Sequence, residues 1–129
     1  MKIYANRDIK SEEYKVSKIN QLMGKDLWVL ADYISHKHGH VKLYIKFIKW
    51  EYDRILMKYD RIFMDFISYD SLVRGVYGLY KDEEIYGMLS GENRFASFVD
   101  EIDTDFSEVY TGQELYDMIR NTPYLPHVM

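Results

Sequence analysis

The sequence predicts a small single α+β domain in which helices pack against an antiparallel β-sheet. Three observations lead to this prediction. A chain of 129 residues is long enough for one domain with one core. Segments rich in β-branched and aromatic residues follow one another with only short connections, which is typical of antiparallel strands. Helical segments occur at separate points and do not alternate regularly with strands, so we treat residues 1–129 as one α+β domain.

Composition and charge indicate a globular protein with a hydrated, polar surface, because 47% of the residues are hydrophobic and 29% are charged. The longest unbroken apolar run, Leu27 to Ala31, is far shorter than the roughly 20 residues of a membrane-spanning helix. The start MKIYANRD meets charge too early for a signal peptide. We therefore expect a cytoplasmic protein without a membrane segment. The chain has no cysteine, which excludes disulfides, thiol nucleophiles and thiolate metal sites.

The first half of the chain predicts a short strand, a helix and a β-hairpin. KIYA (2–5) has strand character. The run SEEYKVSKINQLMG (11–24) predicts a helix that Ser11 caps and Gly24 ends. LWVLADYIS (27–35) and VKLYIKFIKW (41–50) predict two strands that are joined by the short loop HKHGH.

A seven-residue repeat dominates the next segment. YDRILMK (52–58) is followed directly by YDRIFMD (59–65). A repeat of seven returns each side chain to nearly the same side of a helix, whereas in a strand an odd repeat sends it to the opposite face. No Gly, Pro or Asn interrupts residues 41–73. The repeat therefore favours a helix over residues 51–68, and a continuing β-meander is the alternative.

The second half predicts short strands followed by a helix. VYGLY (76–80) and IYGML (85–89) resemble each other around the acidic loop KDEE, and their glycines are candidates for bends or bulges. FASFV (95–99) predicts a strand. Thr111 and Glu114 form a capping box that predicts the start of a C-terminal helix, which Asn121 and Pro123 end.

Common enzyme motifs are missing from the sequence, so we expect no catalysis. Gly24-Lys25-Asp26 lacks the upstream glycine and the following Ser or Thr of a phosphate-binding loop. Gly87 to Gly91 has the wrong spacing for a nucleophile elbow.

Three of the four histidines lie within five residues. Alternation in an extended segment, or a turn at Gly39, would bring His36, His38 and His40 together. Imidazole is a good ligand for zinc, and the fourth ligand could be His127, Asp32 or water. The sequence therefore suggests a zinc site that clamps the hairpin. The alternative is a solvated turn that binds no metal.

The strand VKLYIKFIKW also suggests a nucleic-acid-binding surface. Alternation places lysines and rings on one strand face, which is the pattern of a single-strand binder. The alternative is a structural strand whose lysines lie at the rim of an aromatic core. We favour the structural reading, because an acidic protein repels polyanions. The residues concerned are Lys42, Tyr44, Lys46, Ile48 and Trp50.

Charge is divided unevenly along the chain. Residues 1–63 have a balance of +5 and residues 64–129 one of −9, which gives the net charge of −4. Between Arg94 and Arg120 there is no Lys or Arg but there are seven acidic residues. The two halves could neutralise each other across the domain, or the tract could form an acidic face for a basic partner.

Three stretches resemble small proteins of phages and mobile elements of Firmicutes: KIYANRD (2–8), GKDLWVLADY (24–33) and EVYTGQELYDMI (108–119). Together with the short, acidic and cysteine-free chain, they are similar to type II-A anti-CRISPR proteins, which bind the RNA-guided effector nuclease. A zinc-containing kind of that group would account for the histidines. The resemblance implies a protein inhibitor without catalysis, and it transfers no functional residue by motif.

This implication agrees with the charge distribution, because an RNA-guided nuclease holds nucleic acid in positively charged channels. We expect rings such as Phe106, Tyr110 and Tyr116 to anchor the contact. A small single-strand nucleic-acid-binding domain is the alternative function. The carboxylates that we expect to bind the basic protein partner are Asp100, Glu101, Asp103, Asp105 and Glu108.

Overall fold

The structure is a computed structural model that describes residues 9–35, 39–55, 57–76 and 78–121. Within these ranges all strand pairs are antiparallel and form one sheet in the order β4-β3-β2-β1-β5, with β6 also paired with β1. The predicted α+β class is therefore confirmed. The strands are β1 (Leu27–Ser35), β2 (Gly39–Asp53), β3 (Lys58–Ser68), β4 (Arg94–Phe98), β5 (Ile102–Asp103) and β6 (Val109–Thr111).

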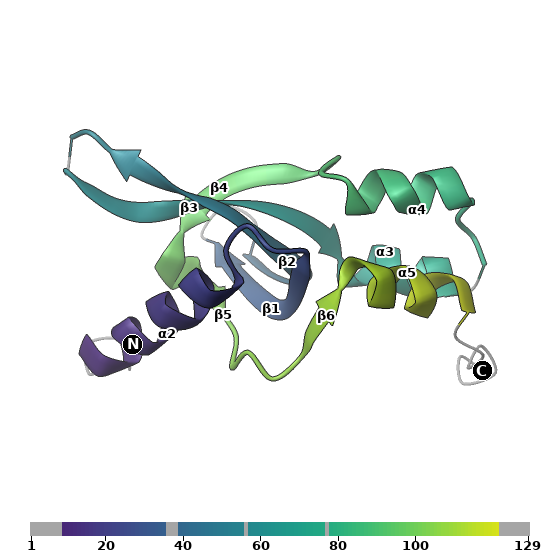
Figure 1. Ribbon diagram of the computed structural model, residues 1–129, viewed down its shortest axis with the longest axis horizontal. Helices are drawn as coiled ribbons and strands as arrows, with labels where there is room; N and C mark the ends of the chain where they lie inside the picture. The colour runs from purple at the N-terminus through teal and green to yellow at the C-terminus, as the bar shows by residue number, and fades with distance from the viewer. Residues whose placement is uncertain (1–8, 36–38, 56, 77, 122–129) are drawn as a thin grey trace.

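The helices lie at two ends of this sheet (Figure 1). A short 3-10 helix, η1 (Val99–Glu101), links β4 to β5. No helix in the described ranges has both the length and the apolar character that crossing a membrane requires. The α-helices of these ranges are α2 (Ile9–Leu22), α3 (Tyr69–Val76), α4 (Asp82–Leu89) and α5 (Gly112–Asn121).

The sheet has an apolar core on each face, because successive side chains of a strand point to opposite sides. On one face Val29, Phe47 and Met64 pack with Ile19 of α2. On the other face the core joins the sheet to α3, α4 and α5; its buried members are Trp28, Tyr44, Ile67, Leu72, Ile85, Met88, Leu115 and Ile119. Since both faces carry large side chains, the central strands read as nearly continuous apolar runs.

Several predicted elements are confirmed. The helix predicted for residues 11–24 is α2, but it begins at Ile9, so Ser11 lies inside the helix and is not its N-cap as we predicted. The predicted hairpin is β1 paired with β2 from Val29↔Ile45 to Ser35↔Gly39. The strand predicted at residues 95–99 is β4. The strand predicted for KIYA lies outside the described residues.

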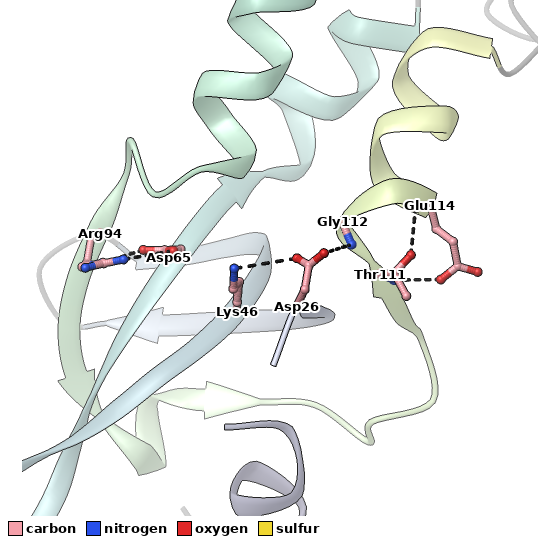
Figure 2. Close-up of polar contacts among 7 residues, drawn as sticks. All are labelled: Asp26, Lys46, Asp65, Arg94, Thr111, Gly112 and Glu114. Carbon is pink, nitrogen blue, oxygen red and sulfur yellow. Dashed lines mark hydrogen bonds and ion pairs between the residues drawn. The ribbon is translucent and has the colours of Figure 1, made fainter. Parts of the chain in front are cut away.

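The capping box predicted for the C-terminal helix is also present. The Thr111 N–H donates to Glu114 Oε1 at 2.7 Å, and the Glu114 N–H donates to Thr111 Oγ1 at 3.0 Å. These contacts satisfy two backbone donors that the first turn of α5 leaves without a partner in the helix (Figure 2).

The helix predicted for residues 51–68 is wrong, and the alternative β-meander is correct. The first copy spans the end of β2 and the turn that follows it, the second lies on β3, and their first residues, Tyr52 and Tyr59, are cross-strand partners. The two rings meet edge to face with centroids 4.8 Å apart. The chain reverses between them, with Met57 in the left-handed region at φ 58°. The repeat thus reflects ring pairing across a hairpin and not the period of a helix.

Of the two glycines expected to mark bends or bulges, Gly78 does lie in a turn with a positive φ of 75°, whereas the prediction for Gly87 is wrong. Residues 82–89 form helix α4, and Gly87 lies inside that helix. The acidic loop KDEE starts the helix, because Asp82, Glu83 and Glu84 occupy its first turn, where the positive end of the helix dipole favours carboxylates. The Lys81 N–H also donates to Glu84 Oε1 at 2.8 Å.

A bulge in β2 separates two residues that alternation placed on one face. The pairing of β2 with β3 shifts by one residue between Phe47 and Lys49, which leaves Ile48 as the extra residue. Trp50 therefore packs on the α2 side of the sheet, whereas Tyr44 is buried in the core on the opposite side. The single face that we predicted for lysines and rings along β2 does not form.

Figure 2 shows an ion pair between two strands of the sheet, β3 and β4, and the contacts of Asp26, which link the sheet to α5. The Arg94 Nε donates to Asp65 Oδ1 at 2.6 Å and balances a carboxylate whose side chain is 3% exposed. Asp26 accepts from the Gly112 N–H at 3.3 Å and lies 3.7 Å from the Lys46 Nζ. Asp26 therefore connects the start of β1 to the start of α5.

Candidate functional site

The segment from β5 to β6 runs along β1 and carries most of the acidic tract. β5 pairs at one end, with Asp103 opposite Asp32, and β6 pairs at the other, with Tyr110 opposite Trp28. Between these two pairings, residues 104–108 leave the sheet as a loop. Because both ends of the loop are held by β1, its acidic side chains have a fixed place on the surface.

Hydrogen bonds to β1 hold the loop in shape. Thr104 Oγ1 donates to the Leu30 carbonyl at 2.8 Å, and the Leu30 N–H donates to the Glu108 carbonyl at 3.0 Å. Phe106 has a positive φ of 59° and packs against the α2-side core. The aromatic residue of the loop therefore points inward while Asp105 and Glu108 stay exposed.

We call the depression between this loop and β1 the acidic pocket. Its volume is about 310 Å³. Among the described residues that line it, four are carboxylates and one is a lysine, so its walls have a strong negative balance. The lining residues are Leu30, Ala31, Asp32, Lys42, Asp103, Thr104, Asp105, Ser107 and Glu108.

The strand register places like charges side by side in the acidic pocket. Asp32 of β1 lies between Asp103 of β5 and Lys42 of β2. The Nε2 of His40 also lies 3.1 Å from Asp32 Oδ1. Lys42 extends over the ring of Tyr69, with its Nζ 5.5 Å from the ring centroid. Two carboxylates directly opposite each other destabilise a strand pair, so this arrangement has a cost for the fold.

Local hydrogen bonds hold the carboxylates of the loop, and those to Asp105 also change its pKa. Ser107 donates to Asp105 Oδ1 through its hydroxyl at 2.6 Å and its backbone N–H at 2.9 Å. These bonds lower the pKa of Asp105, because they favour the charged form. The hydroxyl of Tyr110 donates to Glu108 Oε1 at 2.8 Å. That bond, with burial and the charge of Glu108, raises the pKa of Tyr110 to about 12, so the phenol stays a donor.

The five acidic residues predicted for the partner contact are not all brought together. Asp103, Asp105 and Glu108 line the acidic pocket. Asp100 is exposed on η1 and lines a different groove. Glu101 turns toward the sheet, where it accepts hydrogen bonds from the hydroxyls of Ser97 and Tyr33. The predicted acidic face is therefore smaller than the acidic tract, and Glu101 is engaged within the molecule.

Of the three histidines predicted to bind zinc, only His40 lies within the described residues. His36, His38 and His127 lie outside the described residues. His40 begins β2 and contacts Asp32, which the sequence suggested as a fourth ligand. Within the described ranges, no group of three or more His, Asp or Glu side chains is arranged to hold a metal ion.

Asp32 is the acidic-pocket residue that the partner prediction missed. It is 71 positions away from Asp103 in the sequence, and only the pairing of β1 with β5 brings the two together. The alternation of β1 does place Asp32 on the same face as Trp28 and Leu30, but the strand order that gives it an acidic neighbour is not written in any local pattern.

The acidic pocket is suited to a cationic group. Carboxylate oxygens accept from guanidinium and ammonium donors, and such charge-assisted bonds are about twice as strong as neutral ones. Asp103, Asp105 and Glu108 are exposed, so their carboxylate oxygens are within reach of a partner surface. No protein-family model, curated protein or solved structure matches this chain.

Proposed function

We propose that the chain is a protein inhibitor from a phage or mobile element that binds and blocks a nucleic-acid-handling effector through the acidic pocket, without catalysis. A type II CRISPR nuclease is the partner that we put first. The observation that carries the proposal is the concentration of Asp32, Asp103, Asp105 and Glu108 around one depression in which Lys42 is the lining cation. This is the charge complement of a surface that binds phosphates.

Inhibition would be steric and electrostatic. An RNA-guided nuclease holds its guide and target in positively charged channels. A fixed cluster of carboxylates competes with phosphates for the same arginines and lysines, and the bulk of the domain then excludes the nucleic acid. Tyr110 contacts Glu108 at the cluster and supplies a ring for the contact.

Binding to a purified type II effector with its guide RNA tests this proposal. Asp103→Asn, Asp105→Asn and Glu108→Gln together remove three charges but keep the size of each side chain. A matched variant with Glu13→Gln, Glu83→Gln and Asp117→Asn removes three exposed charges elsewhere. We expect the first variant to lose affinity by at least about tenfold and the second to keep it. Equal affinity of both variants and the parent protein would count against the acidic pocket.

The alternative function, a single-strand nucleic-acid-binding domain, has less support from the geometry. The bulge at Ile48 separates Trp50 from Tyr44, and Tyr44 is 3% exposed. Lys46 lies over the ring of Trp28 and near Asp26. Retention of a single-stranded oligonucleotide on a filter at low salt would nevertheless revive this alternative.

Zinc at the turn between β1 and β2 stays part of the proposal as a structural clamp. Ligand atoms of tetrahedral zinc at about 2.0–2.1 Å lie roughly 3.3 Å from each other. The 3.1 Å between His40 Nε2 and Asp32 Oδ1 is close to that spacing. Elemental analysis of untagged protein should find one zinc per chain, and chelation should lower the melting temperature. Zinc far below one per chain would remove the clamp without affecting the proposal for the acidic pocket.

A further inference from the structure

The ends of β2 and β3 form an arm that extends beyond the rest of the sheet (Figure 1). The described residues of the arm are 49–55 and 57–60, and β4 pairs with β3 only from Arg61 to Asp65. On the α2 side, a groove of about 770 Å³ lies between the arm, α2 and η1. We call it the arm groove. It is lined by Val16, Asn20, Trp50, Lys58, Tyr59, Asp60, Phe98, Val99 and Asp100.

The walls of the arm groove are mainly apolar and remain exposed. Tyr59 is 62% exposed and Phe98 is 43% exposed. Met57, in the turn between β2 and β3, is 71% exposed and contacts the hydroxyl of Tyr52 through its sulfur. The indole N–H of Trp50 donates to Asn20 Oδ1 at 2.8 Å, which ties the base of the arm to α2. A contiguous apolar surface with polar groups at its edge is typical of an interaction site.

Two carboxylates give this apolar groove a defined chemistry. Asp60 Oδ1 is shielded from solvent and has no hydrogen-bond partner among the described residues. Asp60 Oδ2 lies 3.8 Å from the Nζ of Lys58, which is too long for a hydrogen bond. A buried acceptor without a donor destabilises the fold, because it has lost its hydrogen bonds to water. Asp100 adds a second, exposed carboxylate from η1.

We propose that the arm groove is a docking site for a segment of a partner protein that carries an arginine or lysine between apolar residues. The rings of Trp50 and Tyr59 cover the apolar neighbours and attract the cation through their faces, whereas the ring of Phe98 already has the guanidinium carbon of Arg61 at 5.3 Å from its centroid. Asp100 is exposed and accepts its hydrogen bonds, and Asp60 adds a second negative charge to the groove. Charge complementarity thus selects the cation, and the apolar walls select its neighbours.

An extended segment fits this surface better than a small cation does. The arm groove has a volume of about 770 Å³ and is lined by residues of α2, β2, β3 and β4, so it is larger than one side chain can fill. The arm groove and the acidic pocket also have no lining residue in common. Docking in the groove therefore does not depend on the function that we propose for the pocket, and either can fail alone.

Nuclear magnetic resonance of the two tryptophan indole groups tests the docking site on the intact protein. Trp50 lies in the groove, and Trp28, which is 0% exposed, serves as an internal control for the fold. The probes are acetyl-Val-Arg-Leu-amide and its analogues with Gln or Glu in place of Arg. We expect the Arg peptide to shift the Trp50 indole resonance in a saturable way, and the Gln and Glu peptides to bind much more weakly.

Variants assign this binding to the groove. Asp60→Asn should weaken the binding of the Arg peptide by about tenfold, because it removes one of the two negative charges of the groove lining. Lys58→Gln should strengthen it, because Lys58 is the cation of the groove lining. Asp105→Asn, in the acidic pocket, should leave it unchanged. If Asp60→Asn alters the Trp28 resonance, Asp100→Asn replaces it as the test.

Three results would overturn the docking site. The first is no shift of the Trp50 resonance by the Arg peptide up to about 10 mM, the weak end of specific affinity. The second is equal binding of the Arg, Gln and Glu peptides, which would remove the charge selection. The third is binding of benzamidine, a small amidinium, as tight as that of the peptide, which would make the groove a small-molecule site.

Discussion

At the scale of single residues, the carboxylates of the acidic pocket lower the stability of the fold because they repel one another. Asp103 and Asp32 face each other across β5 and β1, and like charges in that position weaken the pairing. We expect Asp103→Asn to raise the free energy of unfolding by about 0.5 kcal/mol, as measured by urea denaturation. Asp117→Asn, on the exposed side of α5, is the control and should have no effect. A loss of stability in Asp103→Asn would show that the carboxylate is held by contacts and not strained by repulsion.

The ionisation of the loop depends on Ser107. Two hydrogen bonds from Ser107 lower the pKa of Asp105, so Ser107→Ala should move that pKa up toward its ordinary value of about 3.9. A folded-state pKa below the unfolded one stabilises the protein above pH 3.9, and this contribution is lost as the pH falls through the folded value. Carboxyl-carbon resonances titrated from pH 2 to 6 measure the shift. An unchanged Asp105 pKa in Ser107→Ala would mean that the loop does not hold this geometry in solution.

At the scale of elements, the start of α5 sets the position of the segment that carries the acidic pocket. Thr111 is both the last residue of β6 and the N-cap of α5. Thr111→Ala should lower the free energy of unfolding by about 1 kcal/mol, because it leaves the Glu114 N–H without its acceptor. Thr111→Ser keeps the hydroxyl and should recover most of that loss. Urea denaturation of the two variants checks the difference, and equal stability of both would argue against the cap.

Local signals predicted the elements that stand on their own, and pairing between distant segments decided the rest. The capping box of Thr111 and Glu114 predicts the start of a helix from four consecutive residues. The sequence patterns that predict α2 and the β1–β2 hairpin are equally local. The repeat at residues 52–65 was ambiguous because a period of seven fits a helix, while cross-strand contact of Tyr52 with Tyr59 depends on a turn that has no Gly or Asn. The helix α4 was missed because its acidic first turn looked like a loop.

At the scale of the whole molecule, charge separation was predicted in outline but not in detail. The sequence shows that the acidic residues concentrate between Arg94 and Arg120. It does not show that Glu101 turns to Ser97 and Tyr33, that Asp100 joins a different surface, or that Asp32 arrives from β1. These outcomes depend on the strand order and on a loop held at both ends, which are properties of the assembled sheet.

The central claim is that the carboxylates of the acidic pocket block a nucleic-acid-handling effector. The most direct measurement is the cleavage of target DNA by a purified type II effector, titrated with the parent protein and with the two triple variants that remove three charges inside or outside the pocket. The account predicts that the parent protein and the outside variant stop cleavage, and that the variant with Asp103→Asn, Asp105→Asn and Glu108→Gln does not. Full cleavage in the presence of the parent protein, or equal inhibition by all three proteins, would contradict it.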